Sequence, residues 1–427
     1  MLDAVPPRPL TVIDCDGSPA AVNAVYAALA RVLAGGERAA VARVLAGEVG
    51  AGSGGGGPPA VLPVASGTAR SRVLAALRPQ EPADGRAALV VATSGSTGRA
   101  KGVELSASAL LASAAATHER LGGAGRWLLA LPVQHIAGAQ VLVRSLLTGH
   151  EPAVLDLRGG FDVDAFAAAA RAVPRHGRRY TALVPTQLVR LLDAGGAGLD
   201  ELRGFDAVLV GGAACPPALM GRATARGARV VTTYGMTETA GGCVYDGRPL
   251  DGVRVRIGAG GRIELAGPTL ALGYRLDPRA TADVFRDGWL RTGDRGTLSA
   301  DGTLDVLGRL DDVIVTGGLK VAAVLVERAL AATPGVAEAC VVGLPDAEWG
   351  DLVAAAIVAT DPADPPYPAE LRTAARELAG PAAVPKLIRF VSALPRSGPG
   401  KIDRTAVRAL LTEPAGTAAP FGDDVTL

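Results

Sequence analysis

The chain has 427 residues, of which 49% are hydrophobic and 20% charged. This composition supplies enough apolar material for two or three packed domains and argues against wholesale disorder. The 43 basic and 42 acidic residues give a net charge of +1, which does not favour a nucleic-acid or anionic-membrane partner.

The four cysteines, namely Cys15, Cys215, Cys243 and Cys340, lie far apart and form no C-x-x-C pair. This argues against a disulfide framework or a structural zinc site.

The N-terminal stretch MLDAVPPRPL lacks a basic region followed by an apolar one, so no signal peptide is visible. Apolar runs such as LVAAAIVA fall far short of the roughly 20 residues that span a bilayer. We therefore expect a soluble, cytoplasmic protein without stable membrane insertion.

In chain order, the first 85 residues contain one predicted helix and a glycine-rich tract at 50–57, which is typical of a flexible surface loop. A strand–helix alternation begins near residue 87. The helix predicted over 106–121 has Ser106 or Ser108 as its N-cap, and the helix over 138–149 ends at Gly149. The other predicted elements in this part are a helix at 20–35 and strands at 88–92, 126–133, 180–185, 205–212 and 228–235.

Strands that alternate with helices predict an α/β fold with helix-covered, mostly parallel sheets in a large N-terminal domain. From about residue 250 the pattern becomes richer in strands and glycines, and from about 311 the chain has enough helices and strands for a small α+β domain. We therefore predict two domains, 1–310 and 311–427. In parallel sheets ligands collect at the carboxyl ends of the strands, and the polar motifs of this chain follow such strands.

The stretch TSGSTGRAKG, residues 93–102, follows one of these predicted strands. Its spacing differs from the common nucleotide loop G-x-x-x-x-G-K-[ST]. Closely spaced small residues let backbone N–H groups converge on an anion, and the hydroxyl groups and Lys101 add further donors. The stretch therefore suits phosphate binding, although alone it fits a solvated glycine–serine turn equally well.

Four further stretches carry polar groups in turns. In TTYGMTET (232–239), a carboxylate beside hydroxyl groups suits a magnesium ion that bridges phosphate oxygens, but it also fits an ordinary helix start. In WLRTGDRG (289–296), an acidic residue could accept hydrogen bonds from ribose hydroxyls. LGRLDD (307–312) supplies an arginine and PRSGPGKIDR (395–404) a lysine, and each alone is a charged turn.

Together, in this order and spacing, the five stretches resemble the adenylate-forming superfamily of acyl- and aryl-CoA ligases, amino-acid adenylation domains and firefly luciferases. The resemblance runs from about residue 87 to 405. It implies ATP, Mg²⁺ and CoA as cofactor and co-substrates. It also implies two reactions, namely adenylation of a carboxylate and transfer of the acyl group to a thiol. A mobile C-terminal domain would then bring a different face to the active site in each reaction.

The resemblance assigns roles residue by residue. Glu238 would help to hold Mg²⁺, Lys401 would reach the α-phosphate and the acid, and Asp311 would be the hinge. The phosphate-binding residues would be Thr93, Ser94, Gly95, Ser96, Thr97, Gly98 and Lys101. The adenine and acyl pockets would be lined by Gly211, Gly212, Ala213, Tyr234, Gly235 and Met236, Thr237 would contact the α-phosphate, and Asp294 and Arg309 would bind the ribose. Gly317 and Gly318 would border the thiol tunnel.

Two stretches indicate which carboxylic acid the enzyme would activate. LPVQHIAGAQVLVRS (131–145) matches the family motif that places His135 beside the acyl carboxylate, and Arg144 interrupts the apolar helix that follows. A buried guanidinium there would need an anion, whereas the alternative is an arginine that extends to the surface. YGMTETAGGCVYDGRPLDGV resembles the o-succinylbenzoate–CoA ligases of menaquinone synthesis, especially the actinobacterial ones. That resemblance implies a dicarboxylate anchored by Arg144, with Gly241 and Gly242 leaving room for its ring.

Three alternatives remain open. The protein could be another aryl- or acyl-CoA ligase with a different acid. It could be a stand-alone adenylation enzyme that loads a carrier protein, although no amine-binding aspartate accompanies LPVQHIAG. It could also be a luciferase-like or non-catalytic member, against which intact Lys101, Glu238 and Lys401 argue. The expected partners are small molecules, and a homodimer is a possible assembly.

Overall fold

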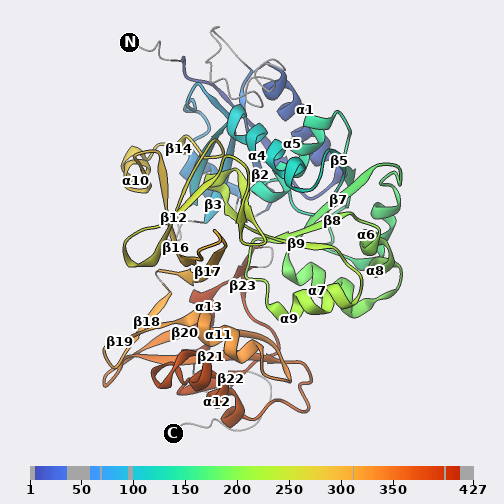
Figure 1. Cartoon of the computed structure of the whole chain (residues 1–427). Helices are drawn as coiled ribbons and strands as arrows, with labels where there is room; N and C mark the ends of the chain where they lie inside the picture. Colours follow the sequence, from blue (N-terminus) through green and yellow to red (C-terminus); the bar gives the residue numbers. More distant parts are fainter. Residues whose placement is uncertain are drawn as a thin grey trace.

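The computed structural model describes residues 5–35, 58–67, 70–94, 100–310, 312–398 and 401–413. The N-terminal part forms a large body and the C-terminal part a smaller one below it (Figure 1). The glycine-rich tract at 50–57, the phosphate-loop residues 95–99 and the expected hinge residue 311 lie outside the described residues, as do the side chains of Ser94 and Lys401.

A seven-stranded sheet with the order β11-β10-β9-β8-β7-β5-β6 is central to the large body. Its strands β5 to β9 run parallel, and β10 turns back antiparallel to β9. The strands are β5 (Gly125–Leu129), β6 (Ala153–Val154), β7 (Arg178–Leu183), β8 (Ala207–Gly211), β9 (Val230–Met236), β10 (Gly241–Tyr245) and β11 (Arg248–Pro249).

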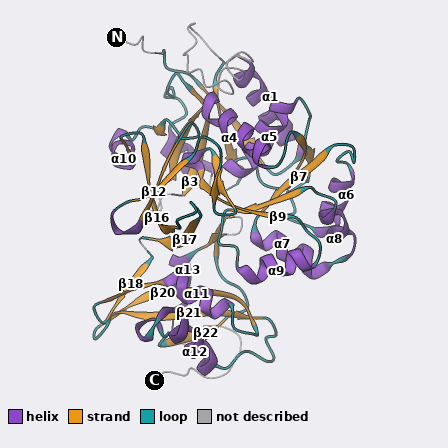
Figure 2. Cartoon of the chain, in the orientation of Figure 1, coloured by secondary structure: helices purple, strands orange, loops and turns teal. Residues whose placement is uncertain are grey.

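Helices cover both faces of this sheet (Figure 2). Along β5, Trp127 and Leu129 belong to one core and Leu128 to another, because successive side chains of a strand point to opposite faces. The first core includes residues of α4 (Ala107–Arg120) and α5 (Ile136–Thr148). The second includes residues of α6 (Val163–Arg171), α7 (Pro185–Ala194), α8 (Gly196–Arg203) and α9 (Pro217–Ala225).

A second sheet, with the order β1-β2-β3-β4-β14, shares the first core. Strands β1 to β3 are parallel, and β4 pairs antiparallel with both β3 and β14. The elements are β1 (Leu10–Cys15), α1 (Pro19–Gly35), β2 (Ala60–Ala65), α3 (Arg70–Leu77), β3 (Ala87–Ser94), β4 (Ala100–Ser106) and β14 (Gly273–Tyr274).

The third sheet of the large body is antiparallel and confirms the strand-rich pattern predicted from about residue 250. It contains β12 (Arg254–Ile257), β13 (Arg262–Ala266), β15 (Phe285–Arg286), β16 (Trp289–Leu298) and β17 (Leu304–Arg309). The helix α10 (Pro278–Val284) and the 3₁₀ turns η1 (Thr237–Thr239) and η2 (Ala259–Gly261) complete this part.

In its described residues, the small body packs helices α11, α12 and α13 and the 3₁₀ turn η3 around a mixed sheet with its own apolar cores. Its sheet is built of β18 (Val313–Thr316), β19 (Leu319–Ala322), β20 (Val336–Asp346), β21 (Gly350–Ala359) and β22 (Leu387–Phe390). The remaining elements are α11 (Ala323–Ala331), α12 (Pro368–Ala379), η3 (Pro381–Ala383), β23 (Arg396–Gly398), β24 (Lys401–Ile402) and α13 (Arg404–Thr412).

The α/β fold class with a small α+β C-terminal part is confirmed. Two helix boundaries follow the predicted chemistry: Ser106 Oγ accepts from Ala109 N–H at 3.1 Å, and Gly149 ends α5 in the left-handed region with φ 72°. The strand predicted to run to residue 133 ends at Leu129. The four cysteines are unpaired. Within the described ranges, no helix has the length and apolar character needed to cross a membrane.

Candidate active site

The predicted nucleotide residues gather where the parallel strands β8 and β9 end. Gly211 closes β8 opposite Thr233, with Gly212 and Ala213 directly beyond it. Gly235 on β9 pairs with Gly242 on β10, and a Cβ atom added to Gly235 would lie 2.2 Å from the Gly241 carbonyl oxygen. Only glycine permits this close approach of two backbones. The turn η1, which carries Thr237 and Glu238, follows directly.

A hydrogen-bonded group joins three of the predicted ATP residues. The Tyr234 hydroxyl donates to Asp294 Oδ2 at 2.7 Å, and Arg309 Nη1 donates to Asp294 Oδ1 at 3.4 Å. Burial, together with the neighbouring Asp294 carboxylate, raises the pKa of Tyr234, so its phenol stays a donor. Pairing of β16 with β17 sets Asp294 opposite Arg309. The structure thus brings Tyr234 together with Asp294, which is 60 positions further along the chain, and with Arg309, which is 75 positions further.

The phosphate stretch begins and ends in one hairpin. Thr93 on β3 pairs with Lys101 on β4, and the Thr93 hydroxyl donates to the Lys101 carbonyl at 3.3 Å. The hairpin sets the two ends of the stretch side by side, as a loop that surrounds an anion requires. The roles of Gly95, Ser96, Thr97 and Gly98 stay predictions, because these residues lie outside the described part.

Tyr274 connects the phosphate stretch with η1 and was not predicted from the sequence. Lys101 Nζ lies 5.0 Å from the centroid of the Tyr274 ring, and the Tyr274 hydroxyl donates to Glu238 Oε1 at 2.8 Å. Burial and the Glu238 carboxylate raise the pKa of Tyr274. The contact depends on pairing of β14 with β4, which are about 170 residues apart, and no local pattern marks such pairing.

Glu238 fits the expected magnesium ligand. Its carboxylate forms no ion pair with a basic side chain among the described residues, and it accepts a hydrogen bond from the neutral Tyr274 phenol. No group of three or more potential metal-binding side chains occurs in the described part of the chain. Mg²⁺ commonly takes one or two carboxylates and completes its shell with water and phosphate oxygens, so a single carboxylate at this position suits it.

Arg144 is buried and 3% exposed, so the alternative of an arginine that extends to the surface is wrong. Its guanidinium carbon lies 4.9 Å from the Trp127 ring centroid, and its Nη2 donates to the Tyr245 hydroxyl at 3.4 Å. In the described part of the chain, its Nε has no hydrogen-bond partner and no carboxylate pairs with its guanidinium. A buried guanidinium without an anion is costly, and this favours a ligand that supplies one.

Among the described residues, the polar side chains that surround Arg144 carry no carboxylate. The Trp127 indole N–H donates to His118 Nε2 at 3.1 Å, so this imidazole nitrogen is an acceptor. Burial, with a smaller contribution from the Arg144 charge, lowers the pKa of His118 to about 4. The Tyr245 hydroxyl also hydrogen-bonds to Thr117 Oγ1 at 2.9 Å. In the described part of the chain, the guanidinium thus contacts the Trp127 ring and the Tyr245 hydroxyl and no carboxylate.

Gln140, one helical turn before Arg144, links α5 to the glycines predicted for the acid pocket. Its amide nitrogen donates to the Ala240 carbonyl at 2.8 Å, and its Oε1 is buried without a partner. A Cβ atom added to Gly241, whose φ is +100°, would lie 3.3 Å from the Gln140 side chain. The predicted Arg144 and Gly241 therefore lie along one interface between α5 and β10.

His135 is the exposed residue that precedes α5, where its extended backbone begins the helix. Although the side chain reaches solvent, surrounding protein atoms lower the pKa of its imidazole by desolvation. Such a ring stays neutral near pH 7 and can accept or donate a hydrogen bond at the mouth of the predicted acid pocket.

Lys401 has a defined backbone position in the small body. It pairs with Gly398 in the β23–β24 hairpin, and β23 lies at the junction of the two bodies (Figure 1). The adjoining α13 is fixed by Arg404, whose guanidinium contacts Glu327 Oε1 at 2.7 Å and Asp312 Oδ2 at 3.0 Å. The Lys401 turn and the residue after the expected hinge thus belong to one packed unit.

Gly317 and Gly318 form the turn between β18 and β19, with φ of +55° and +77°. A Cβ atom added to Gly317 would lie 3.2 Å from the Trp349 ring. The close contact explains the glycine, while the expected thiol tunnel remains a prediction.

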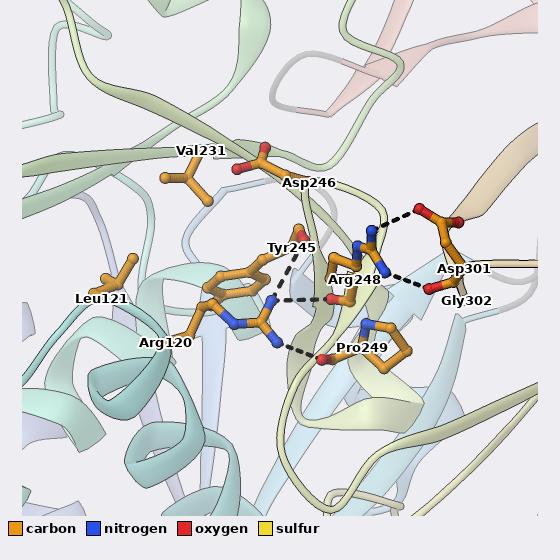
Figure 3. A pocket seen from close by; sticks show the side chains of 9 residues that line it. All are labelled: Arg120, Leu121, Val231, Tyr245, Asp246, Arg248, Pro249, Asp301 and Gly302. Carbon is orange, nitrogen blue, oxygen red and sulfur yellow. Dashed lines mark hydrogen bonds and ion pairs between the residues drawn. The ribbon is translucent and has the colours of Figure 1, made fainter.

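An open hollow of about 650 Å³ lies elsewhere, between the end of α4 and the turn after β10 (Figure 3). Arg120 there donates to the backbone carbonyls of Arg248 and Pro249, and Arg248 pairs with Asp301. The hollow is lined by Val231 of β9 and Tyr245 of β10 rather than by the residues at the carboxyl ends of β8 and β9. Its arginines already have partners, so it is not the candidate active site.

Comparison with known proteins places the chain in a class. Residues 58–275 match the model of the AMP-binding enzymes, and residues 325–401 match that of the AMP-binding enzyme C-terminal domain. The chain therefore belongs to the family of AMP-binding, adenylate-forming enzymes.

Within that family, the chain is similar to succinylbenzoate–CoA ligases. A probable 2-succinylbenzoate–CoA ligase of Mycobacterium tuberculosis is 48% identical over 357 residues, which cover 83% of this chain and 91% of that protein. The o-succinylbenzoate CoA synthetase of Bacillus subtilis in complex with the acyl-adenylate intermediate OSB-AMP has a TM-score of 0.66 at 29% identity, covering 77% of this chain and 69% of the other. Its complex with ATP and magnesium ion has a TM-score of 0.65 at 28% identity, covering 78% and 74%.

Proposed function

We propose that this protein is an AMP-forming acid–thiol ligase that converts o-succinylbenzoate (2-succinylbenzoate), ATP and CoA into o-succinylbenzoyl-CoA, AMP and pyrophosphate, for menaquinone synthesis. The observation that carries the choice of acid is the buried Arg144 guanidinium, which has no carboxylate partner among the described residues. A dicarboxylate supplies both the group to be activated and the anion that Arg144 lacks. The 48% identity to a probable 2-succinylbenzoate–CoA ligase supports the same acid.

The first reaction joins two anions. A carboxylate oxygen of the acid attacks the α-phosphorus of ATP, and the bond to the pyrophosphate oxygen breaks. Lys101 and the phosphate stretch would restrain the β- and γ-phosphates, Asp294 would accept from the ribose hydroxyls, and Lys401 would offset the charge at the α-phosphate. Mg²⁺, held by Glu238, would supply positive charge to the phosphate oxygens when bound.

The second reaction needs a different arrangement. The thiol sulfur of CoA attacks the acyl carbon of the adenylate, AMP leaves, and the thioester forms. Because Lys401 would obstruct the approach of the thiol, the small domain (311–427) is expected to rotate against the large one (1–310) about Asp311. In that second arrangement Gly317 and Gly318 would border the thiol path. We propose a cytoplasmic enzyme, and a homodimer is a possible assembly.

The identity of the acid substrate is tested by incubating the purified protein with ATP, Mg²⁺, CoA and a panel of carboxylic acids. The products are identified by mass spectrometry. The expected result is an o-succinylbenzoyl-CoA mass and AMP, with much weaker products from benzoate, fatty acids and amino acids. A preference for one of those other acids would refute the substrate, while leaving the ligase chemistry in place. Formation of AMP without any thioester would instead indicate a stand-alone adenylation enzyme.

A further inference from the structure

Tyr274 lies in a rigid position between the phosphate stretch and the η1 turn. Its backbone pairs with Val103 on β4, and its N–H donates to Thr281 Oγ1 at 2.8 Å. The next residue, Arg275, is 5% exposed, donates from its backbone to the Gly102 carbonyl at 2.7 Å and pairs with Glu104 at 3.2 Å. The side chain of Tyr274 therefore projects from a backbone that is fixed on both sides.

The two ends of the Tyr274 side chain contact two residues of opposite charge. The ring face contacts the Lys101 ammonium, whose nitrogen lies 5.0 Å from the ring centroid, within the range of a cation–π interaction. The hydroxyl donates to Glu238 Oε1 at 2.8 Å. Lys101 lies on β4 and Glu238 in the turn η1, 137 positions apart in the sequence, and Tyr274 contacts both at once.

We propose that Tyr274 is a positioning residue for Mg²⁺–ATP, which holds the phosphate-binding Lys101 and the metal-binding Glu238 apart and in place before the nucleotide arrives. If Lys101 and Glu238 were free to move, they could pair with each other. Such a pair would occupy the carboxylate that the metal needs. The aromatic ring attracts the ammonium without neutralising it, and the phenol orients the carboxylate while leaving Oε2 available. Such preorganisation reduces the ordering cost of binding. The inference rests on the roles proposed above for Lys101 and Glu238.

Two substitutions separate the two contacts. Tyr274→Phe keeps the ring under Lys101 and removes the hydrogen bond to Glu238, whereas Tyr274→Leu removes both. Nucleotide binding is measured by calorimetry on the full-length protein, with ATP alone and with ATP plus Mg²⁺, and without any acid. Because no acid is present, the outcome does not depend on which carboxylate the enzyme activates.

Tyr274→Phe is expected to weaken binding of Mg²⁺–ATP about tenfold, because the metal ligand Glu238 loses its hydrogen bond from the phenol. Binding of metal-free ATP should stay within about twofold of the wild-type affinity, because the ring that contacts Lys101 is kept. Tyr274→Leu is expected to weaken metal-free ATP about threefold as well, the size of a surface cation–π contact. Thioester formation from supplied acyl-adenylate should stay near the wild-type rate in both variants, because that step uses neither pyrophosphate nor its metal.

The matched control is Tyr180→Phe, which removes a phenol that donates to the Leu121 and Gly123 carbonyls, both at 3.0 Å, within the core. It should lower the Tm and leave both nucleotide affinities unchanged. Equal weakening of ATP with and without Mg²⁺ by Tyr274→Phe would overturn the proposal, and so would unchanged affinities in both Tyr274 variants.

Discussion

The guanidinium of Arg144 donates from Nη2 to the hydroxyl of Tyr245 at 3.4 Å in the buried interface between α5 and β10. The same hydroxyl is hydrogen-bonded to Thr117, so the phenol is held from a second direction. A neutral acceptor orients a guanidinium without cancelling its charge. The charge of Arg144 thus stays available for an anionic group of the substrate.

Arg144→Gln should raise the KM for o-succinylbenzoate at least tenfold and leave the KM for ATP unchanged. The reason is that loss of a hydrogen bond between charged groups in a buried site costs about 1.5–3 kcal/mol. Initial rates at varied acid and at varied ATP distinguish the two constants. Arg126→Gln serves as the control, because Arg126 contacts the exposed His176 and lies outside the site. An unchanged KM for the acid would leave Arg144 as a core residue only.

Tyr245→Phe should raise the KM for the acid by a smaller factor, about three- to fivefold, because the guanidinium remains but loses its orienting acceptor. In the Arg144→Gln background the same change should have little further effect, since the two residues act on one contact. The double-mutant cycle measures this coupling directly. Additive effects of the two substitutions would show that Tyr245 does not act through Arg144.

The elements that the sequence predicts well are those with local signals. Ser106 at the start of α4 and Gly149 at the end of α5 mark both helices, and the polar residues after β8 and β9 identify the sheet edge that carries the site. The strands β1, β2 and β4 were not predicted. Pro63 lies inside β2, where a proline ordinarily argues against a central strand. β2 nevertheless lies between β1 and β3, and its register pair with β3 joins Val61 to Leu89, two positions before the proline.

The site residues divide in the same way. His135, Arg144 and Glu238 lie in recognisable motifs and can be found in the sequence. Tyr274 and Tyr245 cannot, because their roles come from contacts between segments that are more than 30 positions apart. The Arg144–Tyr245 contact spans 101 positions and the Tyr274–Glu238 contact 36. Packing of α5 against β10 decides the first contact and pairing of β14 with β4 the second, and no short sequence pattern encodes either.

Lys401→Ala should abolish adenylate formation from acid and ATP, with a loss of at least a hundredfold, and should largely spare thioester formation from supplied adenylate. The charge of Lys401 is needed only while two anions approach each other. Pyrophosphate release measures the first reaction, and thioester mass measures the second. Lys386→Ala is the control, because Lys386 stacks on Trp349 in the same small body. Equal loss of both reactions in Lys401→Ala would refute the assigned role.

His118 should make the folded protein less stable in mild acid. Its pKa is lowered from 6.5 to about 4 by burial, so the unfolded chain binds the proton first as the pH falls below 6.5. Stability is therefore present above that pH and is lost towards pH 4, and this group alone removes about 2 kcal/mol of unfolding free energy between pH 7 and pH 5. His118→Gln keeps an acceptor for the Trp127 indole and removes the titration, so denaturant unfolding at the two pH values should show a smaller loss than in the wild type. His150→Gln, at an exposed position, should retain the wild-type loss. The same pH dependence in His118→Gln and the wild type would assign the acid sensitivity to other groups.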